Sequence, residues 1–321
     1  MSHYKKHYSW QYRIEKLFFT YIPNRHDNLK QLFFKSLFLL ACIGVLASAF
    51  LVGKHFLSEK YEQAVIENSR KIWYKTPIED FVEELEEKGN KFDPRRRIKK
   101  ELLRQNDDFV GWIVLDGTQL DNPVYKAKNN TFYLTHNSLG KKSSIGTVFM
   151  DADNTFTKKK VDKNLVLFGK NAESGAIFGE LEKFRSLSFY KENPTINFTS
   201  LYSDGIYKIY AVFILNAKAE DDAGVVYNIY NQPDNAESFE DWYLEATQRS
   251  LINTTVDVSL DDEFLTLVTN TEDFENSRLV VMARKTRAGE DSLVDTQDAV
   301  LNPTPKYPKK WYSSRGIKYP F

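Results

Sequence analysis

The chain has 321 residues, and its 44 Lys and Arg are balanced by 44 Asp and Glu, so the formal net charge is zero. This balance gives no overall field that would attract nucleic acid, and no nucleic-acid partner is predicted. With 42% hydrophobic and 27% charged residues, the composition excludes wholesale disorder and a multi-span membrane protein. The single cysteine, Cys42, excludes an internal disulfide and a cysteine-rich zinc site, and no metal or other cofactor is expected.

The first predicted element is an apolar segment near the N-terminus. Residues 37–52 carry no charge, and extension back to residue 32 gives about the 20 residues that a bilayer crossing requires. A buried core helix is one alternative, and a signal peptide cleaved near 47–49 is another, although more than thirty residues precede the apolar run. We predict a transmembrane signal anchor over 32–53. Residues 1–31 hold six basic and two acidic side chains and are expected to be cytoplasmic, which places the rest outside the cell.

Two regions with different periodicity follow the anchor. Residues 54–106 are charged and have the apolar spacing of helices, which predicts a helical stalk of two or three helices. Residues 107–288 contain short β-branched or aromatic segments bounded by Gly, Asn, Asp or Pro, which are typical of strands. Many short strands at close spacing favour a sandwich or a closed barrel. The expected strands are 110–115, 124–125, 147–150, 164–168, 195–198, 207–215, 264–269 and 278–284.

Two helices and a C-terminal tail complete the prediction. One helix is expected over 176–184, and a second over 238–249, where an amphipathic face should dock on the strands. Residues 289–321 form a basic and aromatic tail that has four prolines after residue 301, so we predict an extended segment without helix. Three roles are open for it: packing of Trp311 and Tyr312 on the barrel, attraction to anionic lipid or wall polymer, and occupancy of a ligand groove by 302–305.

Four blocks of sequence resemble a known family. They are DFVGWIVLDGTQLDNPVY (108–125), FYLTHNSLGKKSSIGTVFMD (132–151), NLVLFGKNAESGAIFGEL (164–181) and FLTLVTNTEDFENSRLVVMAR (264–284). In this order they resemble the class B sortases over roughly 180 residues. Sortases are membrane-anchored cysteine transpeptidases of Gram-positive bacteria, which cut a sorting signal and join the protein to peptidoglycan or to a pilin. The resemblance implies a mostly β fold, an eight-stranded β-barrel with added helices.

The resemblance also implies which positions form the active site. The family histidine of a Y-G-H-N block falls on Lys170, and the family cysteine of an L-T-L-S-T-C block falls on Asn270. The arginine before the last strand is retained as Arg278. Substrate contacts are implied at Asn171, Val268 and Thr269. The scaffold is therefore expected to be kept while the nucleophile and the base are replaced.

These replacements remove the family chemistry. An amide has no nucleophilic electron pair usable at neutral pH, and a charged lysine has three donors but no acceptor. Loss of nucleophile and base together costs on the order of 10⁶ in kcat in a serine protease. We expect Lys170 to donate to the side-chain carbonyl of Asn270. A dyad of Lys170 with the hydroxyl of Thr269 or Thr271 is the alternative chemistry, and His136 is expected to have a structural role.

The sequence thus predicts a catalytically inactive sortase-like protein of the cell surface. It would bind sorting-signal-like peptides, pilins or a partner sortase in cell-wall anchoring or pilus assembly. One alternative is an active sortase-fold transpeptidase or peptidase that uses residues outside the family pattern. Another is a wall-associated spacer with no ligand.

Overall fold

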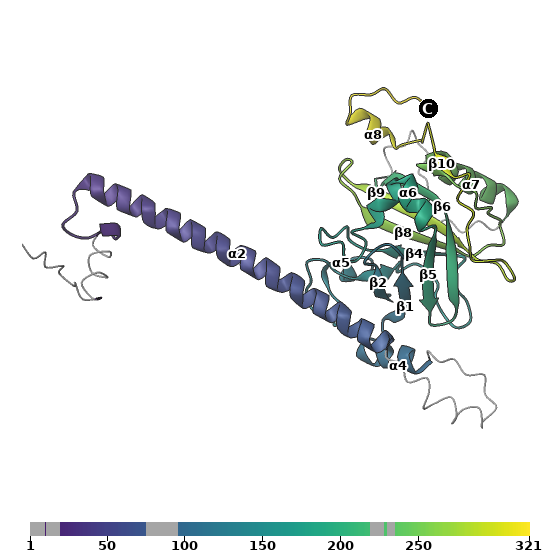
Figure 1. Cartoon of the computed structure of the whole chain (residues 1–321), viewed down its shortest axis with the longest axis horizontal. Helices are drawn as coiled ribbons and strands as arrows, with labels where there is room; N and C mark the ends of the chain where they lie inside the picture. Colours follow the sequence, from purple (N-terminus) through teal and green to yellow (C-terminus); the bar gives the residue numbers. More distant parts are fainter. Residues whose placement is uncertain (1–9, 11–19, 75–95, 219–227, 230–234) are drawn as a thin grey trace, which may run out of the picture. The chain divides into compact units, whose positions relative to one another are not determined.

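The chain divides into two compact units, Met1–Lys60 and Tyr61–Phe321. The computed structural model shown in Figure 1 describes residues 10, 20–74, 96–218, 228–229 and 235–321. The predicted stalk residues 75–95 therefore lie outside the described residues. Each unit is considered by itself below.

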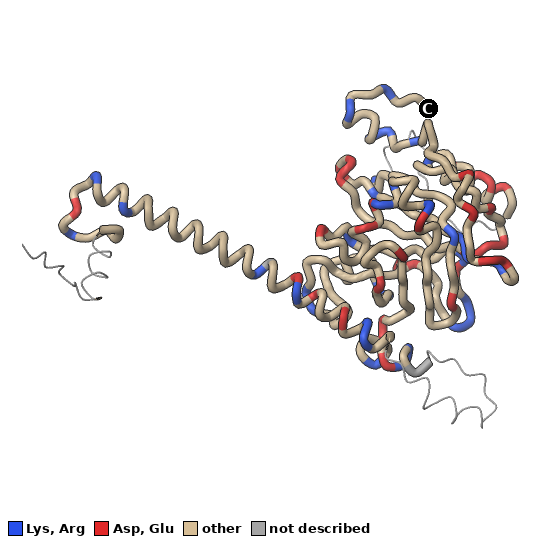
Figure 2. Tube along the Cα trace, viewed as in Figure 1, with Lys and Arg blue, Asp and Glu red and all other residues tan. Residues whose placement is uncertain are grey.

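The first unit contains the apolar N-terminal part of helix α2, and the whole helix spans Leu29–Trp73. The helix begins with a reciprocal cap, in which Asn28 Oδ1 accepts from the Gln31 amide and Gln31 Oε1 accepts from the Asn28 amide. Between Lys35 and Lys54 there is no charged side chain, which Figure 2 shows as an uninterrupted tan stretch. This helix is long and apolar enough to cross a membrane, as predicted, and Cys42 lies within it.

The second unit is built on a closed barrel of eight strands in the order β1-β2-β3-β4-β8-β9-β6-β5. All neighbours are antiparallel except β2 with β3 and β4 with β8. The strands are β1 Phe109–Val114, β2 Asp121–Tyr125, β3 Val148–Met150, β4 Asn164–Phe168, β5 Thr195–Ser200, β6 Asp204–Asn216, β8 Phe264–Asn270 and β9 Ser277–Lys285. Each of the eight predicted strands is present, and the barrel prediction is confirmed.

The helices and a small second sheet lie around this barrel (Figure 1). They are α4 Arg96–Gln105, α5 Phe132–Thr135, the 3₁₀ helix η1 Leu181–Arg185, α6 Leu187–Glu192, α7 Ala236–Arg249, α8 Lys309–Ser313, and the paired strands β7 Ile252–Asn253 and β10 Val300–Leu301. Helix α7 packs Trp242 and Ala246 against the outer side of the barrel, where Phe264 and Val268 are buried. The amphipathic prediction for this helix is confirmed.

The prediction of a helix over 176–184 is wrong for its first half, which forms a turn. Ile177 has a positive φ of 57°, and Gly179 packs directly on the backbone of Ala172, where a β-carbon would clash. These two features bend the chain into a tight turn, and a 3₁₀ helix starts only at Leu181. Ile177 and Phe178, in the first half of the predicted helix, are instead buried in the barrel core.

The tail also differs from the extended segment that was predicted. Leu301 pairs with Ile252 in the small sheet, and helix α8 starts directly after Pro308. A proline is tolerated at a helix start because it has no amide to lose there, and no proline lies within Lys309–Ser313. The rings of Tyr307 and Trp311 stack 4.0 Å apart, and both side chains pack against the barrel core. The packing role predicted for Trp311 is therefore confirmed.

The end of α2 is fixed to the barrel by aromatic and polar contacts within the second unit. The rings of Trp73 and Trp112 stack with centroids 4.8 Å apart. Trp112 Nε1 donates to Asp121 Oδ1 at 2.7 Å, and Arg70 Nε donates to the Asp121 carbonyl at 2.8 Å. The last turns of α2, which lie in the first half of the predicted stalk, are thus part of the folded barrel unit.

Replacing Trp73 with Ala is expected to destabilise the barrel unit by about 3 kcal/mol, the lower end for a buried Trp, because 9% of its surface stays exposed at the edge of the cluster. Denaturant unfolding followed by circular dichroism measures this loss. Trp10→Ala is the matched control, since Trp10 is 77% exposed and lies in the other unit. Equal unfolding midpoints for the two variants would show that the stack adds nothing to stability.

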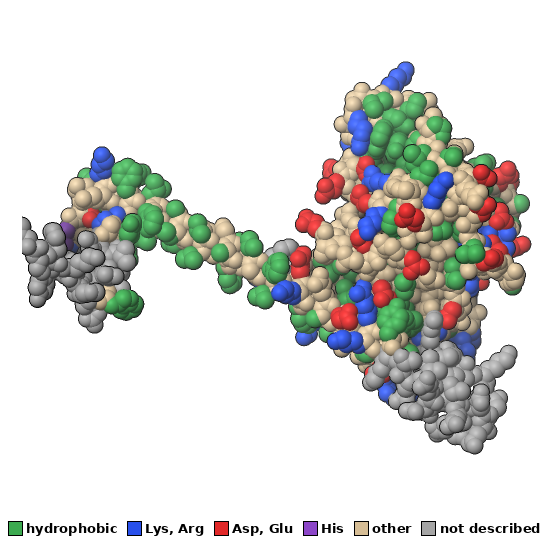
Figure 3. Space-filling view, viewed as in Figure 1, with side chains coloured by type: hydrophobic (Ala, Val, Ile, Leu, Met, Phe, Trp, Pro, Cys, Tyr) green, Lys and Arg blue, Asp and Glu red, His purple; other side chains and the backbone are tan. Residues whose placement is uncertain are grey.

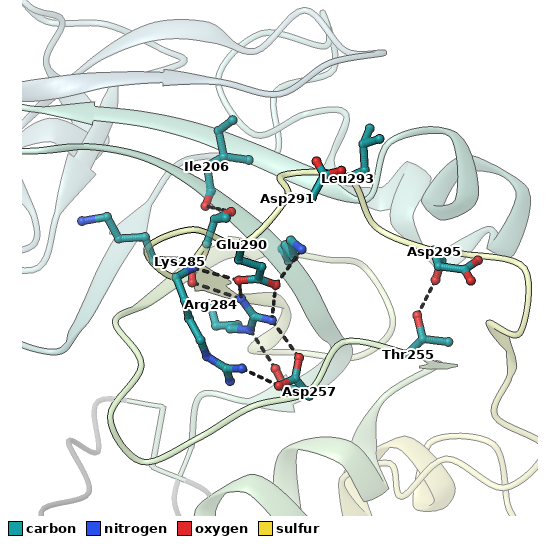
Figure 4. Close-up of polar contacts among 12 residues, drawn as sticks. Ile206, Thr255, Asp257, Arg284, Lys285, Glu290, Asp291, Leu293 and Asp295 are labelled. Carbon is teal, nitrogen blue, oxygen red and sulfur yellow. Dashed lines mark hydrogen bonds and ion pairs between the residues drawn. The ribbon is translucent and has the colours of Figure 1, made fainter.

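An ion network joins the end of β9 to the loops beside it (Figure 4). Arg284, near the end of β9, is buried and donates to Asp257 Oδ1 at 2.8 Å and Glu290 Oε1 at 2.7 Å. Arg287 donates to both carboxylate oxygens of Asp262, at 2.7 and 2.8 Å. The network ties the loop after β9 to the segment that leads into β8. Because Arg278 and Arg284 lie at opposite ends of β9, the other end of the barrel remains for the predicted site.

Candidate cleft at the ends of strands β4, β8 and β9

The register of three strands brings the predicted catalytic positions to one end of the barrel. Strands β4 and β8 are parallel with Phe168 opposite Val268, so Lys170 and Asn270 each lie two residues beyond that pair. Asn270 is the last residue of β8 and pairs with Arg278 on β9. Lys170, Asn171, Asn270 and Arg278 are called the cleft residues below.

The polar contacts of the cleft differ from those predicted. Lys170 Nζ donates to the Ser144 carbonyl at 2.7 Å, and Asn270 Oδ1 accepts from the backbone amide of Asn171 at 3.2 Å. The predicted hydrogen bond from Lys170 to Asn270 is therefore wrong. The amide of Asn171 is at the position after Lys170, so the turn itself supplies a donor and the ammonium turns to a neighbouring loop.

A groove continues from the cleft toward the C-terminal segment. Its volume is about 470 Å³, and its lining includes Asn171, Glu182, Arg185, Glu272, Asp273 and Arg315. Asn171 joins the two regions, because its side-chain Nδ2 donates to Glu182 Oε1 at 3.1 Å while its backbone amide contacts Asn270. The cleft residues and the groove are thus adjacent and share Asn171.

Asp273 lines this groove and is held in place by several hydrogen bonds. Arg185 donates to both of its carboxylate oxygens, and Thr271 Oγ1 donates to Oδ2 at 2.9 Å. Burial opposes ionisation of Asp273, but the hydrogen bonds and charge of Arg185 outweigh it and hold the pKa of the carboxyl below its usual value. The turn that follows Asn270 is therefore fixed by a charged pair, and Asp273 is ionised at neutral pH.

The two hydroxyls of the alternative dyad are placed away from this chemistry. Thr269 is 1% exposed and its Oγ1 has no hydrogen-bond partner among the described residues. Thr271 Oγ1 is bonded to Asp273 and to Ser277 Oγ at 2.7 Å. Neither hydroxyl is hydrogen-bonded to Lys170 in the part of the chain that the structure describes. The structure does not assemble a hydroxyl–lysine pair.

The implied substrate contacts fall into two groups. Asn171 lines the groove, whereas Val268 is 3% exposed and belongs to the apolar cluster beneath α7. Thr269, one residue further, points to the opposite face of β8 because side chains alternate along a strand. The side chains of Val268 and Thr269 therefore present almost no surface to a ligand.

His136 lies in a short loop after α5 and has local partners. Its Nδ1 is 2.9 Å from the Phe132 carbonyl, and its ring stacks on the Phe132 ring with centroids 4.3 Å apart. The predicted structural role is confirmed. Since His136 is the one histidine between residues 107 and 288, the barrel sequence has no second imidazole to serve as a base.

Some residues of the groove were not predicted as site residues. Glu272 and Asp273 directly follow Asn270, so their place in sequence is a usable signal. Arg185 and Arg315 give no local signal, because only the fold brings them to Asp273. The ion pairs of Asp273 with these two arginines are properties of the tertiary structure.

Comparison with known proteins gives one consistent result. No family model matches the chain. Sortase B of Listeria monocytogenes is 28% identical over 258 residues, which is 80% of this chain and 98% of that protein. The crystal structure of Clostridium perfringens sortase B is 30% identical with a TM-score of 0.52, and the match covers 59% of this chain and 99% of that one. A Staphylococcus aureus sortase B–substrate complex, 24% identical with a TM-score of 0.58, shares the fold over 73% of this chain and 100% of its own.

Three observations point to the same family: the order of the sequence blocks, the closed eight-stranded barrel with its added helices, and these matches. The match to the Listeria protein spans nearly all of that relative, so it is not limited to one motif. The chain is a sortase B homologue and belongs to the class B sortases.

Proposed function

We propose that this chain is a cell-surface class B sortase homologue that binds a sorting-signal-like peptide in the cleft and does not cleave it. In this proposal Lys170 and Asn270 occupy the family positions of the histidine and the cysteine, and Arg278 is the retained arginine. The protein carrying the peptide would be a pilin or another wall protein, and an active partner sortase is the enzyme that would process it.

The observation that carries the proposal is the chemistry of positions 170 and 270. The Asn270 carboxamide accepts from a backbone amide, and the Lys170 ammonium donates to a backbone carbonyl. Neither group is a nucleophile or a base in these roles, since an amide nitrogen has no basic lone pair and an ammonium has no acceptor. The single thiol of the chain, Cys42, lies in the apolar part of α2 and has no place in the barrel.

Binding is supported by what the cleft retains. Arg278 stands opposite Asn270, and the adjoining groove offers amide, carboxylate and guanidinium groups that match the polar backbone of an extended peptide. The Staphylococcus aureus relative was solved in complex with a substrate. A chain that keeps the same fold and loses the reactive groups would hold such a peptide without turnover.

The membrane part of the proposal rests on α2 and its flanks. The apolar stretch would anchor the protein by one span, with the basic N-terminal residues on the cytoplasmic side and the barrel outside. This orientation would present the cleft to wall proteins that leave the cell. Accessibility of the barrel to protease on intact cells tests the orientation directly.

Peptide binding and turnover can be measured on the full-length protein in detergent micelles. With a fluorescent synthetic peptide that begins Asn-Pro, the start shared by class B sorting signals, we expect saturable anisotropy and no cleavage product by mass spectrometry. Arg278→Ala should weaken binding by about tenfold, the value of one charge-assisted hydrogen bond.

Lys158→Ala, which removes an exposed cation from the loop before β4, is the matched control and should leave the affinity unchanged. Cleavage that is abolished by changing a barrel residue would establish the enzyme alternative. Absence of binding would favour the wall-associated spacer.

A further inference from the structure

The C-terminal segment reaches the same groove as the cleft residues. After pairing with β7 through Leu301, the chain passes α7, where the Lys306 amide donates to the Gln248 carbonyl at 2.9 Å and its ammonium pairs with Glu245. It then forms α8 and reaches the groove at Arg315, which is part of the lining. Residues 300–315 are called the brace below.

The brace contacts the turn that follows the cleft residue Asn270. Arg315 Nη2 lies 3.6 Å from Asp273 Oδ1, and Nη1 donates to the Asp273 carbonyl at 3.5 Å. The guanidinium is also held over the Trp311 ring, 4.2 Å from its centroid, and so is ordered by its own segment. Asp273 is thereby fixed by Arg185 from the barrel side and by Arg315 from the brace.

Apolar packing holds the brace in this place. Tyr307 and Trp311 pack against the barrel core, and Tyr312 is buried. In Figure 3 hydrophobic side chains gather over this segment with basic side chains beside them. The removal of apolar surface from water, nearly complete for Tyr312 and partial for Tyr307 and Trp311, accounts for the fixed position of the brace.

The turn between β8 and β9 needs such support. Asn276 adopts a positive φ of 67°, which an Asn side chain tolerates at a small cost in energy. The turn is closed by the Thr271 amide donating to the Ser277 carbonyl at 3.2 Å. Because Asn270 and Arg278 stand directly at its two ends, any movement of the turn moves the cleft.

We propose that the brace is part of the peptide-binding groove: Arg315 forms its outer wall and holds the Thr271–Asn276 turn in the conformation that shapes the cleft. A guanidinium has five donors. Among the described residues, the hydrogen bonds of Arg315 use only Nη1, and Nη2 faces Asp273, so Nε and the second hydrogen of Nη2 remain for a carbonyl or carboxylate of the ligand. This inference rests on the proposed peptide binding for the ligand and on the fold alone for the turn.

Hydrogen exchange on the full-length protein in detergent micelles tests the turn without any ligand. Arg315→Ala should speed amide exchange in residues 271–277 by about fivefold or more, because the local opening free energy falls by about 1 kcal/mol when a partly exposed ion pair is lost. Lys318→Ala removes an exposed cation three residues further and should leave exchange unchanged. Equal exchange of 271–277 in the two variants would overturn the role of Arg315 in holding the turn.

The fluorescent Asn-Pro peptide tests the groove. Arg315→Ala should weaken its binding about fivefold or more, Arg315→Lys should restore part of the loss, and Lys318→Ala should have no effect. Binding that is equal in all variants would overturn the role of Arg315 in the groove while leaving the proposed function in place. If the unaltered protein does not bind the peptide, the proposed function and the ligand role of Arg315 are both wrong. The hydrogen-exchange result then still shows whether Arg315 holds the turn.

Discussion

The double variant Lys170→His with Asn270→Cys is expected to contain a thiol that ionises at a pH at least one unit lower than in Asn270→Cys alone. Positions 170 and 270 each lie two residues past the aligned pair of β4 and β8, and the turn amide of Asn171 already contacts the Asn270 side chain. An imidazolium held at that place would stabilise the thiolate by an ion pair. The pH dependence of alkylation by iodoacetamide gives the thiol pKa in each variant.

The controls follow from the single cysteine of the chain. The unaltered protein reports the background reactivity of Cys42, and Cys42→Ser in all variants removes it. Lys170→His alone adds an imidazole without a thiol and should react like the unaltered protein. The signature is non-additivity, because nucleophile and base act as a unit.

If the double variant also regains peptide cleavage, we expect Arg278 to stabilise the developing oxyanion, since it is the strand partner of position 270. Equal thiol pKa values in the single and double variants would mean that the two side chains do not meet. The assignment of Lys170 and Asn270 to the family positions would then be wrong, although membership of the family would stand.

The barrel was predictable because its signals are local. Strand β4 has the predicted bounds, 164–168, since a short apolar run between polar turns has few other interpretations. Helix α7 was predicted within two residues because its apolar face repeats with helical period. The cleft positions were predicted from the two sequence blocks, 164–181 and 264–284, that contain strands β4 and β8.

The remaining features depend on contacts between distant residues. The turn at Gly179 arises from close packing on Ala172, and the tail is held by the contact of Arg315 with Asp273. Neither feature has a periodic pattern in the sequence. Prolines predicted the absence of helix in the tail, yet Pro308 marks a helix start, because the effect of a proline depends on its position. The partners of Lys170 and Asn270 were missed for the same reason, since a backbone carbonyl or amide carries no sequence signal.

Replacing Arg284 with Ala is expected to destabilise the barrel unit by about 3 kcal/mol, because it removes a buried side chain together with its hydrogen bonds to Glu290 and to the Asp257 carbonyl, whereas the Asp257 carboxylate is 71% exposed and returns to water. The Arg284 side chain is 1% exposed, and it links Asp257 and Glu290 across the end of the barrel (Figure 4). Arg287→Ala is the matched control. Arg287 shares Asp257 but is 38% exposed, so its loss should cost at most about 1 kcal/mol in denaturant unfolding.

The same network predicts how stability changes with pH. Hydrogen bonds from Arg284 hold the pKa of Glu290 below its usual value, and hydrogen bonds from Arg287 lower that of Asp257. A carboxyl with a lowered folded-state pKa stabilises the fold above its unfolded pKa, about 4, and this stabilisation is lost as the pH falls through the folded value. The unaltered protein should therefore lose stability below about pH 4, and Arg284→Ala should lose less over the same range. A difference between the two proteins that is the same at pH 7 and pH 3 would show that Arg284 acts by packing alone and not through its ion pairs.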